Sequence, residues 1–488
     1  MHLLVVSLSD RRCGSVGILA AAEKSAGMRL RRGSFLAALS AAAAVPAAAS
    51  GVDLAPSPAR AADAVRSEFL HAWNGYKLVA WGRDEVRPVS GTARDFFIPG
   101  QSFGLSIVEA LDTLYVMGLD DDLARATKWI VDNLSFDVDG EVQMFETNIR
   151  MVGGLLAGYY ATGEKRMLEL AHDLADRLLP CFTKSPTGAP YRFVNLRTGA
   201  VREPKMNLAE IGTNVLEFGD VSRLTGDPKY LNASLRAFEA VIAKRSQLNL
   251  LATYFDIETG EFTSPEDVAP NDPVDSFYEY LWGGWQMLGL QQCHDWYRML
   301  TDAILAHSVD RANGELWFAT VDYRTGEKIG HTQSELAAFY AELVAKGGDR
   351  QVGSDYYDAF TTMLRRYEVI PEGFDYRTLE AMEDRGNQLR PEYVNASCDL
   401  WFLTQDQKYR DTAWSYFTAM RDHCRVANGY TVVKDVTTRP MTLGDYTPAY
   451  AFAENFKYLY LMFATTPRFD PSTYYMSTEG KLLRGLVR

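Results

Sequence analysis

Long stretches of this chain carry apolar residues at the three- and four-residue spacing of an amphipathic helix, with short polar loops between them. Alternation of the kind seen in strands is scarce and short, as in 429–433. The pattern therefore predicts an all-α or nearly all-α architecture. The clearest helical segments are 106–117, 148–160, 167–179, 209–224 and 276–290.

An imperfect repeat joins these helices. The segments 161–165, 224–230 and 403–409 are three versions of one turn, each placed between a helix and a second helix rich in alanine. Gly163 and Gly226 are 63 residues apart, and Asp227 and Asp406 are 179 apart, close to three such periods. A period of about 60 fits one helix-loop-helix pair, so the chain after residue 61 holds roughly seven pairs. A solenoid satisfies the same period, so the repeat does not show closure into a barrel.

The composition and net charge of the chain limit the kinds of partner that it can bind. With 488 residues, 47% hydrophobic and 12% aromatic, the chain is a globular protein. Its formal charge of −13 disfavours a nucleic-acid partner, which needs a basic face, and suits a neutral sugar or a bound cation better. The cysteines lack zinc-site spacing and are interpreted as structural thiols. They are Cys13, Cys181, Cys293, Cys398 and Cys424.

The N-terminal region is typical of a secretory signal. From Met28 the chain has a basic start, an apolar alanine- and leucine-rich run and small residues suited to a signal peptidase. Arg31-Arg32 loosely resembles a twin-arginine export motif. We expect 1–61 to comprise an over-extended start and a removed signal, and 62–488 to form one catalytic domain, exported to the periplasm or secreted. An uncleaved membrane anchor is the alternative, but we expect no stable membrane association.

Glu146 and Arg150 stand four residues apart in 144–156, a segment that is apolar on most of its circumference. Such a helix lies on the inside of a fold, so both side chains are expected to face a polar cavity. The alternative is an ordinary ion pair between residues i and i+4.

Asp275 opens the aromatic segment 275–282. Asp275 or Ser276 could cap a helix there, and Ser276 with Glu279 could form a capping box. The aromatic residues are compatible with a sugar-binding wall, although aromatics at helical spacing more often belong to a core.

Glu392 follows Pro391, which suits the first position of a helix and puts Glu392 in the first turn. The helix dipole favours an ionised carboxylate at this place, the state that a general base requires. A glutamate that only complements the dipole is the alternative.

Glu454 lies in 450–461, which is apolar nearly all round, so its carboxylate needs a partner or a wet cavity. Lys457 is a possible partner. The polar residues 476–480 follow on a tail that would ordinarily be taken as disordered. Several semi-buried carboxylates in a helical protein indicate glycosidase chemistry, in which two carboxylates flank the bond that is cut.

The ordered series of these segments resembles the class I α-mannosidases, glycoside hydrolase family 47. The resemblance spans nearly all of the chain after the signal region. The segments that carry it are 72–76, 81–88, 103–115, 145–156, 208–210, 275–281, 389–392, 453–461 and 477–479.

The resemblance implies an (α/α)7 barrel, inversion at the anomeric carbon and one Ca²⁺ ion. By motif it makes Glu146 the acid, Asp275 a second acid or an electrostatic group, and Glu392 the base. Thr478 would give calcium its hydroxyl and its carbonyl oxygen. The substrate would be the terminal α-1,2-linked mannose of an α-mannose-containing oligosaccharide, and the protein a monomer. The implied substrate-binding residues, some of which would hold calcium-bound water, are Arg150, Glu210, Tyr450, Glu454 and Glu479.

Three departures from the family pattern stand out. Residues 335–339 replace a His-Leu-x-Cys-Phe segment, so the disulfide of eukaryotic members has no counterpart at Ala338. Asn395 stands where a second glutamate usually follows, and Pro273 replaces the residue two before Asp275. Two other functions stay open: a non-catalytic mannose-binding protein on the same barrel, and another α/α-barrel enzyme such as a lyase or epimerase.

Overall fold

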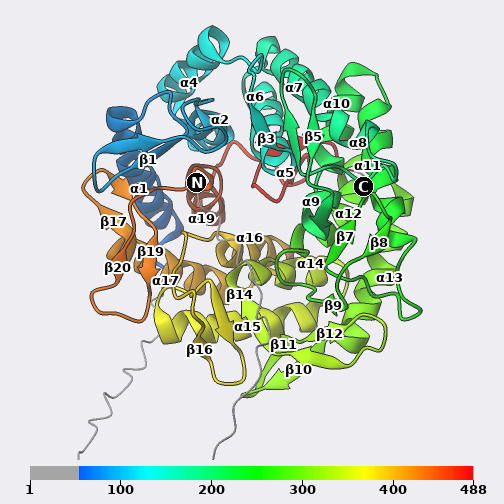
Figure 1. Ribbon diagram of the computed structural model, residues 1–488. Helices are drawn as coiled ribbons and strands as arrows, with labels where there is room; N and C mark the ends of the chain where they lie inside the picture. The colour runs from blue at the N-terminus through cyan, green and yellow to red at the C-terminus, as the bar shows by residue number, and fades with distance from the viewer. Residues whose placement is uncertain (1–53, 487–488) are drawn as a thin grey trace, which may run out of the picture. The chain divides into compact units, whose positions relative to one another are not determined.

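Residues 54–486 are described by a computed structural model, in which helical hairpins stand in a ring (Figure 1). The expected signal segment and Cys13 lie outside the described residues. The colours of Figure 1 follow the chain round the ring, from blue through green and yellow to orange. Helix α1 begins at Pro58, so the expected domain boundary after residue 61 falls inside this helix, where Ala61 is buried.

The outer ring consists of amphipathic helices. In α7, one face buries residues three and four apart, from Met167 to Leu178, and leaves the other face to solvent. The Glu164 side chain caps this helix by accepting a hydrogen bond from the backbone N–H of Arg166. The outer helices are α1 (Pro58–Val79), α4 (Asp120–Asn133), α7 (Lys165–Leu178), α11 (Lys229–Ile242), α13 (Gln291–His307), α15 (Arg350–Tyr367) and α17 (Gln407–Cys424).

The inner ring is buried almost all round, as the apolar circumference of these segments predicts. Most inner segments are not continuous helices but break into two pieces. A short extra helix, α8 (Pro180–Thr183), lies outside this scheme. The inner elements are α2 (Leu105–Glu109), α3 (Leu111–Val116), α5 (Met144–Glu146), the π-helical turn η1 (Thr147–Val152), α6 (Gly153–Thr162), α9 (Leu208–Gly212), α10 (Val215–Thr225), α12 (Asp275–Leu288), the 3₁₀ turn η2 (Glu335–Phe339), α14 (Tyr340–Lys346), α16 (Glu392–Thr404), α18 (Tyr450–Ala453) and α19 (Asn455–Phe463).

The repeated turn joins an inner helix to the outer helix that follows it. Gly163, Gly226 and Gln405 each end an inner helix in the left-handed conformation, with φ of 75°, 78° and 59°. The ring closes because α19 packs against both α1 and α3, the first outer and an early inner helix. Together with the six hairpins that are continuous in sequence, the α19–α1 pair completes the (α/α)7 barrel. The predicted fold is confirmed.

Short strands are more frequent than the sequence pattern predicted. They lie in the long loops and pair as small antiparallel sheets of two or three strands. In the longest pairing, Val309 stands opposite Phe318 and Ala312 opposite Glu315. The segment 429–433 is divided between two sheets, because β18 pairs with β17 while β19 pairs with β20. The loop strands are β1 (Glu85–Arg87), β2 (Thr92–Arg94), β3 (Glu141–Gln143), β4 (Phe193–Asn195), β5 (Val201–Arg202), β6 (Lys205–Asn207), β7 (Tyr254–Asp256), β8 (Glu261–Phe262), β9 (Glu266–Asp267), β10 (Val309–Ala312), β11 (Glu315–Phe318), β12 (Thr320–Asp322), β13 (Lys328–Gly330), β14 (Thr332–Ser334), β15 (Gly373–Asp375), β16 (Glu380–Ala381), β17 (Arg425–Val426), β18 (Gly429–Tyr430), β19 (Val433–Asp435) and β20 (Thr442–Leu443).

The C-terminal tail is an ordered hairpin inside the ring, contrary to the disorder ordinarily expected of such a tail. Strands β21 (Tyr474–Met476) and β22 (Leu482–Arg484) pair antiparallel, with Tyr475 opposite Leu483. They contact the inner helices α12 and α6, and the red segment of Figure 1 runs inside the ring. The hairpin tip, residues 477–481, is largely buried.

The four cysteines within residues 54–486 are free and buried, which confirms the interpretation as structural thiols. Burial raises the pKa of Cys293 to about 12, so this thiol is unreactive at neutral pH. In the same part of the chain, no helix combines the length and apolarity that a membrane crossing requires.

A buried ion pair joins α19 to α3 where the ring closes. Lys457 Nζ lies 2.8 Å from Asp112 Oδ2, and the side chains are 0% and 2% exposed. Lys457→Met leaves the Asp112 charge buried without this partner, so we expect the free energy of unfolding to fall by about 3–5 kcal/mol. Urea unfolding followed by circular dichroism measures this change.

Lys128→Met is the matched control, because Lys128 pairs with Asp132 on the surface, where the side chains are 78% and 50% exposed. It should change stability by less than about 1 kcal/mol. Equal unfolding midpoints for the two variants would contradict the role given to the buried pair.

Candidate active site

The direction of the inner helices gathers the predicted carboxylates at one end of the barrel. Each inner helix is followed by an outer one, so the inner helices run parallel and their N-terminal ends lie together. Asp275 is the first residue of α12 and Glu392 the first residue of α16. Glu210 lies in the short α9, and Glu454 stands at the break between α18 and α19. Positions far apart in sequence therefore converge.

One pocket collects four of the predicted site residues. Asp275, Glu392, Glu454 and Thr478 all line it, from α12, α16, the α18–α19 break and the tip of the C-terminal hairpin. Residues that the sequence analysis did not assign to the site complete the wall. They are Ser276, Glu279, Leu336, Phe339 and Asn395.

Burial and mutual repulsion dominate the electrostatics of this pocket. Burial raises the pKa of Asp275 to about 7, and Asp272 and Glu392 add to the shift. Burial also raises the pKa of Glu454 well above its ordinary value, with repulsion from Glu479 and Glu392 as the next causes. Burial and repulsion thus favour the protonated forms of Asp275 and Glu454 when no cation is present.

Glu279 and Thr478 connect α12 to the hairpin tip. Thr478 lies within hydrogen-bonding reach of the Glu279 carboxyl, whose pKa burial raises well above its usual range. The backbone turn that holds Thr478 is closed by Gly480 N donating to Ser477 O at 2.7 Å and Ser477 N donating to Lys481 O at 3.0 Å. A tight turn therefore fixes the threonine at the pocket.

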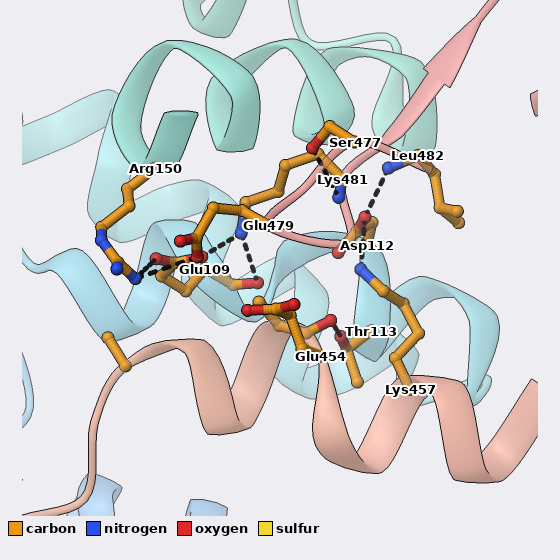
Figure 2. A network of polar contacts seen from close by, with 12 residues as sticks. Glu109, Asp112, Thr113, Arg150, Glu454, Lys457, Ser477, Glu479, Lys481 and Leu482 are labelled. Atoms are coloured by element: carbon orange, nitrogen blue, oxygen red, sulfur yellow. Dashed lines mark hydrogen bonds and ion pairs between the residues drawn. The ribbon is translucent and has the colours of Figure 1, made fainter. Parts of the chain in front are cut away.

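Arg150 forms the centre of a second group beside the pocket. Its Nε lies 2.6 Å from Glu146 Oε2, and its Nη1 lies 3.2 Å from Glu109 Oε1 and 2.9 Å from Glu479 Oε2. Figure 2 shows dashed lines from the Arg150 guanidinium to Glu109 and Glu479, which lie on the same side of it. The pair is therefore more than the ordinary i, i+4 ion pair that the sequence left open. The π-helical turn η1, which starts directly after Glu146, presents both side chains on this side.

Two buried lysines pair with Glu109 and Asp112, and we call this group of charges beside Arg150 the floor of the barrel. Lys481, from the hairpin tip, pairs with Glu109, and both side chains are fully buried. Leu482 N donates to Asp112 Oδ2 at 2.9 Å beside the Lys457 pair (Figure 2). Burial raises the pKa of Glu479 to about 8, against the opposing effect of Arg150. The floor of the barrel is a connected set of buried charges.

Glu210 and Tyr450 lie at the edges of these groups. Arg192 Nε and Gln143 Nε2 each donate to the Glu210 carboxylate at 2.7 Å. Tyr450 donates its hydroxyl to the backbone carbonyl of Gln388, and the Arg150 guanidinium carbon lies 5.4 Å from its ring centroid. The Tyr450 hydroxyl therefore has a protein partner.

Two of the alternatives weighed at the sequence level are wrong. Ser276 is the second residue of α12, whose N-cap is Val274, so Ser276 and Glu279 form no capping box. The Ser276 hydroxyl instead accepts from Thr213 Oγ1 at 2.8 Å. Lys457 hydrogen-bonds Asp112 and not Glu454, so Glu454 keeps its place at the pocket.

Several buried polar residues of the site were missed. Glu279 stands one turn after Asp275 on a helix that is otherwise aromatic, which is a signal for a shared face. Glu109 and Asp112 lie inside an apolar helical run, the same kind of signal that singled out Glu454. Lys481 gave no signal of its own, although the family resemblance had assigned its neighbours Thr478 and Glu479 to the site.

The site can be compared with known proteins. The family model described as glycosyl hydrolase family 47 matches residues 68–485. Mannosyl-oligosaccharide 1,2-alpha-mannosidase IB of Mus musculus is 34% identical in an alignment 432 residues long that covers 82% of this chain and 66% of that protein. Mannosyl-oligosaccharide 1,2-alpha-mannosidase IA of Sus scrofa is 32% identical in an alignment 450 residues long that covers 87% of this chain and 68% of that protein. The chain thus spans about two thirds of the length of these relatives.

Among solved structures, an alpha-1,2-mannosidase from Trichoderma reesei superposes with a TM-score of 0.80 at 24% identity. The match covers 88% of this chain and all of that one. At this identity the likeness concerns the fold, and it agrees with the (α/α)7 barrel.

The raised pKa of Asp275 predicts a pH dependence of stability. The pKa is about 7 in the folded chain and about 4 when unfolded, so the folded state holds the proton more tightly. The stabilisation is complete below about pH 4 and is lost as pH rises through about 7. In EDTA, the free energy of unfolding of the parent should fall between pH 5 and pH 8. For Asp275→Asn this loss of free energy should be smaller, by an amount on the order of a few kcal/mol.

Asp120→Asn is the control for this measurement, because Asp120 is exposed and Arg468 lowers its pKa. Its contribution is already complete above about pH 4, so the slope between pH 5 and 8 should stay that of the parent chain. An Asp275→Asn slope equal to the parent slope would contradict the prediction.

Proposed function

Because the chain belongs to glycosyl hydrolase family 47, we propose that it is an exo-acting hydrolase that removes terminal α-1,2-linked mannose from oligosaccharides, with inversion and with calcium. Membership confirms the prediction of a glycoside hydrolase. The observation that carries the proposal is the convergence of Asp275, Glu392 and Glu454 on the pocket that also contains Thr478. Cleavage of a glycosidic bond needs two carboxyl groups in different protonation states, and a cluster of this kind supplies them.

Glu392 is assigned the role of general base. It is the first residue of α16, where the helix dipole favours the ionised carboxylate. Arg390 acts in the same direction, against the effect of burial. Glu392 would take a proton from the attacking water on one side of the sugar ring, which gives inversion when the leaving oxygen is protonated from the other side.

Glu146 and Asp275 each meet part of what a general acid requires. Asp275 lines the pocket, and its pKa of about 7 lets it hold a proton at neutral pH. Glu146 lies beside the pocket next to Arg150 and would act on the leaving oxygen directly or through one water. The family resemblance assigns the acid to Glu146 and leaves Asp275 as acid or electrostatic group. The two assignments predict different behaviour with a substrate that needs no protonation.

The donor set of the pocket fits calcium. Within residues 54–486, no three His, Cys, Asp or Glu side chains converge as direct ligands of one ion. Oxygen atoms of Thr478 stand instead among the carboxyls of Glu279, Glu392 and Glu454. Ca²⁺ takes six to eight oxygen ligands, among them hydroxyl, carbonyl and water oxygens. When bound, it would orient water and sugar hydroxyls and offset the negative charge, while Thr478 holds it by its hydroxyl and carbonyl oxygens.

Recognition of the sugar is assigned to the residues around the base. Glu454 and Glu479 present carboxyls to sugar hydroxyls, with Arg150 fixing Glu479. Glu210, held by Arg192, and the ring face of Tyr450 lie at the margin. Export through the N-terminal segment belongs to the proposal as well, and rests on the signal-like sequence after Met28 alone.

The first test of the proposal follows the sugar released from an α-1,2-mannobiose by NMR. We expect β-mannose to appear first, activity to disappear in EDTA, and calcium to restore it. Release of α-mannose first would rule out inversion, and unchanged turnover in EDTA would rule out the metal. Binding of the disaccharide without turnover would favour the alternative, a non-catalytic mannose-binding protein.

A second test separates base from acid with α-mannosyl fluoride, whose leaving group needs no proton. Glu392→Gln should lose about 10²–10⁴-fold in kcat on both substrates, because the base is needed for each. Glu146→Gln should lose turnover of the disaccharide and keep turnover of the fluoride. Calorimetric titration with mannobiose should show binding by Glu392→Gln close to that of the parent.

The pattern among the variants decides the assignment. If Asp275→Asn keeps turnover of α-mannosyl fluoride and Glu146→Gln does not, the acid is Asp275 and not Glu146. Full disaccharide turnover by Glu392→Gln would remove Glu392 from the mechanism.

A further inference from the structure

Arg192 lies beside the site and has hydrogen-bond donors that the protein does not use. Its Nε donates to Glu210 Oε2 at 2.7 Å, and its side chain is 24% exposed. Gln143 Nε2 donates to the other oxygen of that carboxylate, also at 2.7 Å. Within residues 54–486, neither Nη atom of Arg192 donates a hydrogen bond to the protein. The two outer N–H₂ groups of the guanidinium are therefore available to a ligand.

The main chain places Arg192 next to the first candidate acid. The carbonyl of Arg192 accepts a hydrogen bond from Met144 N at 2.8 Å. Met144 begins helix α5, and Glu146 ends it. The backbone of Arg192 is thus tied to the element that carries Glu146.

The partner of Arg192, Glu210, is tied in the same way to the second candidate acid. Helix α9, which contains Glu210, packs against α12, which Asp275 begins. Ala209 N donates to Pro273 O at 3.2 Å, two residues before Asp275. A proline has no side-chain donor, so a donor to a sugar at this place has to come from a neighbouring element. Arg192 is such a donor.

Tyr254 is a large aromatic side chain on the surface next to the same carboxylate. It is 41% exposed and begins strand β7, where it stands opposite Asn207 of β6. Asn207 Oδ1 in turn accepts from Glu210 N at 2.8 Å. In the described part of the chain, no aromatic ring or cation stacks on the Tyr254 ring, and its hydroxyl has no hydrogen-bonded partner. Its ring face is therefore open to a ligand.

The electrostatics of Tyr254 agree with this position. Burial raises the pKa of its hydroxyl, Asp272 raises it further, and Arg192 lowers it. Opposite effects of these two charges are expected when both lie near the ring. The guanidinium and the aromatic ring therefore belong to one patch of the surface.

The chemistry of the leaving group matches such a patch. An exo-acting hydrolase holds the terminal sugar in the pocket, so the rest of the oligosaccharide lies outside it, next to the acid that protonates the leaving oxygen. Sugars offer hydroxyl oxygens to N–H donors and a face of C–H groups to an aromatic ring. Arg192 adjoins both candidate acids, so this holds whichever of them is the acid.

We propose that Arg192 and Tyr254 bind the part of the oligosaccharide that leaves. Arg192 donates to hydroxyls of the sugar next to the cleaved bond, and Tyr254 stacks on the sugar after it. Both are specificity-determining residues and move no proton. The preferred substrates are therefore oligosaccharides with at least two sugars beyond the cleaved bond. This inference rests on the proposed function, since it takes the pocket as the site of the terminal mannose.

Two substrates of different length test the role of Tyr254. α-1,2-Mannobiose has one sugar beyond the cleaved bond, and α-1,2-mannotriose has two. From initial rates, Tyr254→Ala should raise KM for the trisaccharide about tenfold, and clearly more than for the disaccharide, because one stacking contact is lost. The kcat for the trisaccharide should change by less than about twofold, because the contact is the same in the ground state and the transition state. Tyr254→Phe keeps the ring and should keep KM within about twofold of the parent.

Arg192→Lys tests the other half of the patch. Lysine keeps a positive charge for Glu210 but loses the forked donors, so kcat/KM should fall about tenfold, by the same factor for both substrates. Tyr191→Ala is the matched control, because Tyr191 precedes Arg192 and donates its hydroxyl to Glu258 at 3.0 Å. It should leave the ratio of kcat/KM between the two substrates as in the parent.

Two results would overturn the proposal. One is a ratio between the substrates that Tyr254→Ala leaves unchanged, and the other is parent-like kcat/KM of Arg192→Lys on both.

Calorimetry gives a readout without turnover. In a Glu392→Gln background with calcium, Tyr254→Ala should weaken mannotriose binding about tenfold and mannobiose binding by less than about threefold. Equal weakening of both would show a structural effect and would also overturn the inference. The proposed function fails by a separate result, namely no release of mannose from either substrate by the parent chain.

Discussion

Charge matching in the floor of the barrel is the constraint on which the rest of the structure depends. Glu109 and Asp112 are buried on adjoining inner helices, where an uncompensated carboxylate costs several kcal/mol. Their partners come from three different parts of the chain: Arg150 from η1, Lys457 from α19 and Lys481 from the C-terminal hairpin. Removal of any one of these elements leaves a buried charge of another element without its partner. The ion pairs of the floor therefore hold the first, second and last inner segments and the tail together.

The same matching explains why the pocket above the floor is acidic. The lysines and Arg150 are already paired with Glu109, Asp112, Glu146 and Glu479. The carboxyls of Asp275, Glu279 and Glu454 therefore face the pocket without a direct cationic partner of this kind, and burial raises the pKa of each. Such a pocket favours a ligand that brings positive charge and hydroxyl donors. A divalent cation would supply the positive charge and a sugar would supply the hydroxyl donors, so the pocket suits the two together.

Much of the fold could be predicted because helical periodicity and the repeated turn are local signals. The left-handed residues Gly163 and Gly226 end their helices as the repeat indicates. Helical spacing and the repeat did not predict closure, since closure depends on α19 meeting α1 and α3 across almost the whole chain. The closed barrel was expected only from the family resemblance. Local patterns did not predict the ordered tail either, because Lys481 pairs with Glu109, 372 residues away. Only the family resemblance, through Thr478 and Glu479, implied that the tail reaches the site. The pocket was predicted where a carboxylate interrupted an apolar helix, as at Glu454.

The wrong pairing of Glu454 with Lys457 has a physical cause that also bears on the function. Spacing rules assume a continuous helix, and most of the inner segments are interrupted. At Glu454, with φ of −119° and ψ of −74°, the segment breaks between α18 and α19. The three-residue offset to Lys457 therefore does not bring the two side chains together, and Lys457 turns to Asp112 on α3. Glu454 and Lys457 therefore form no ion pair. The break leaves that carboxylate at the pocket, while Lys457 neutralises the floor.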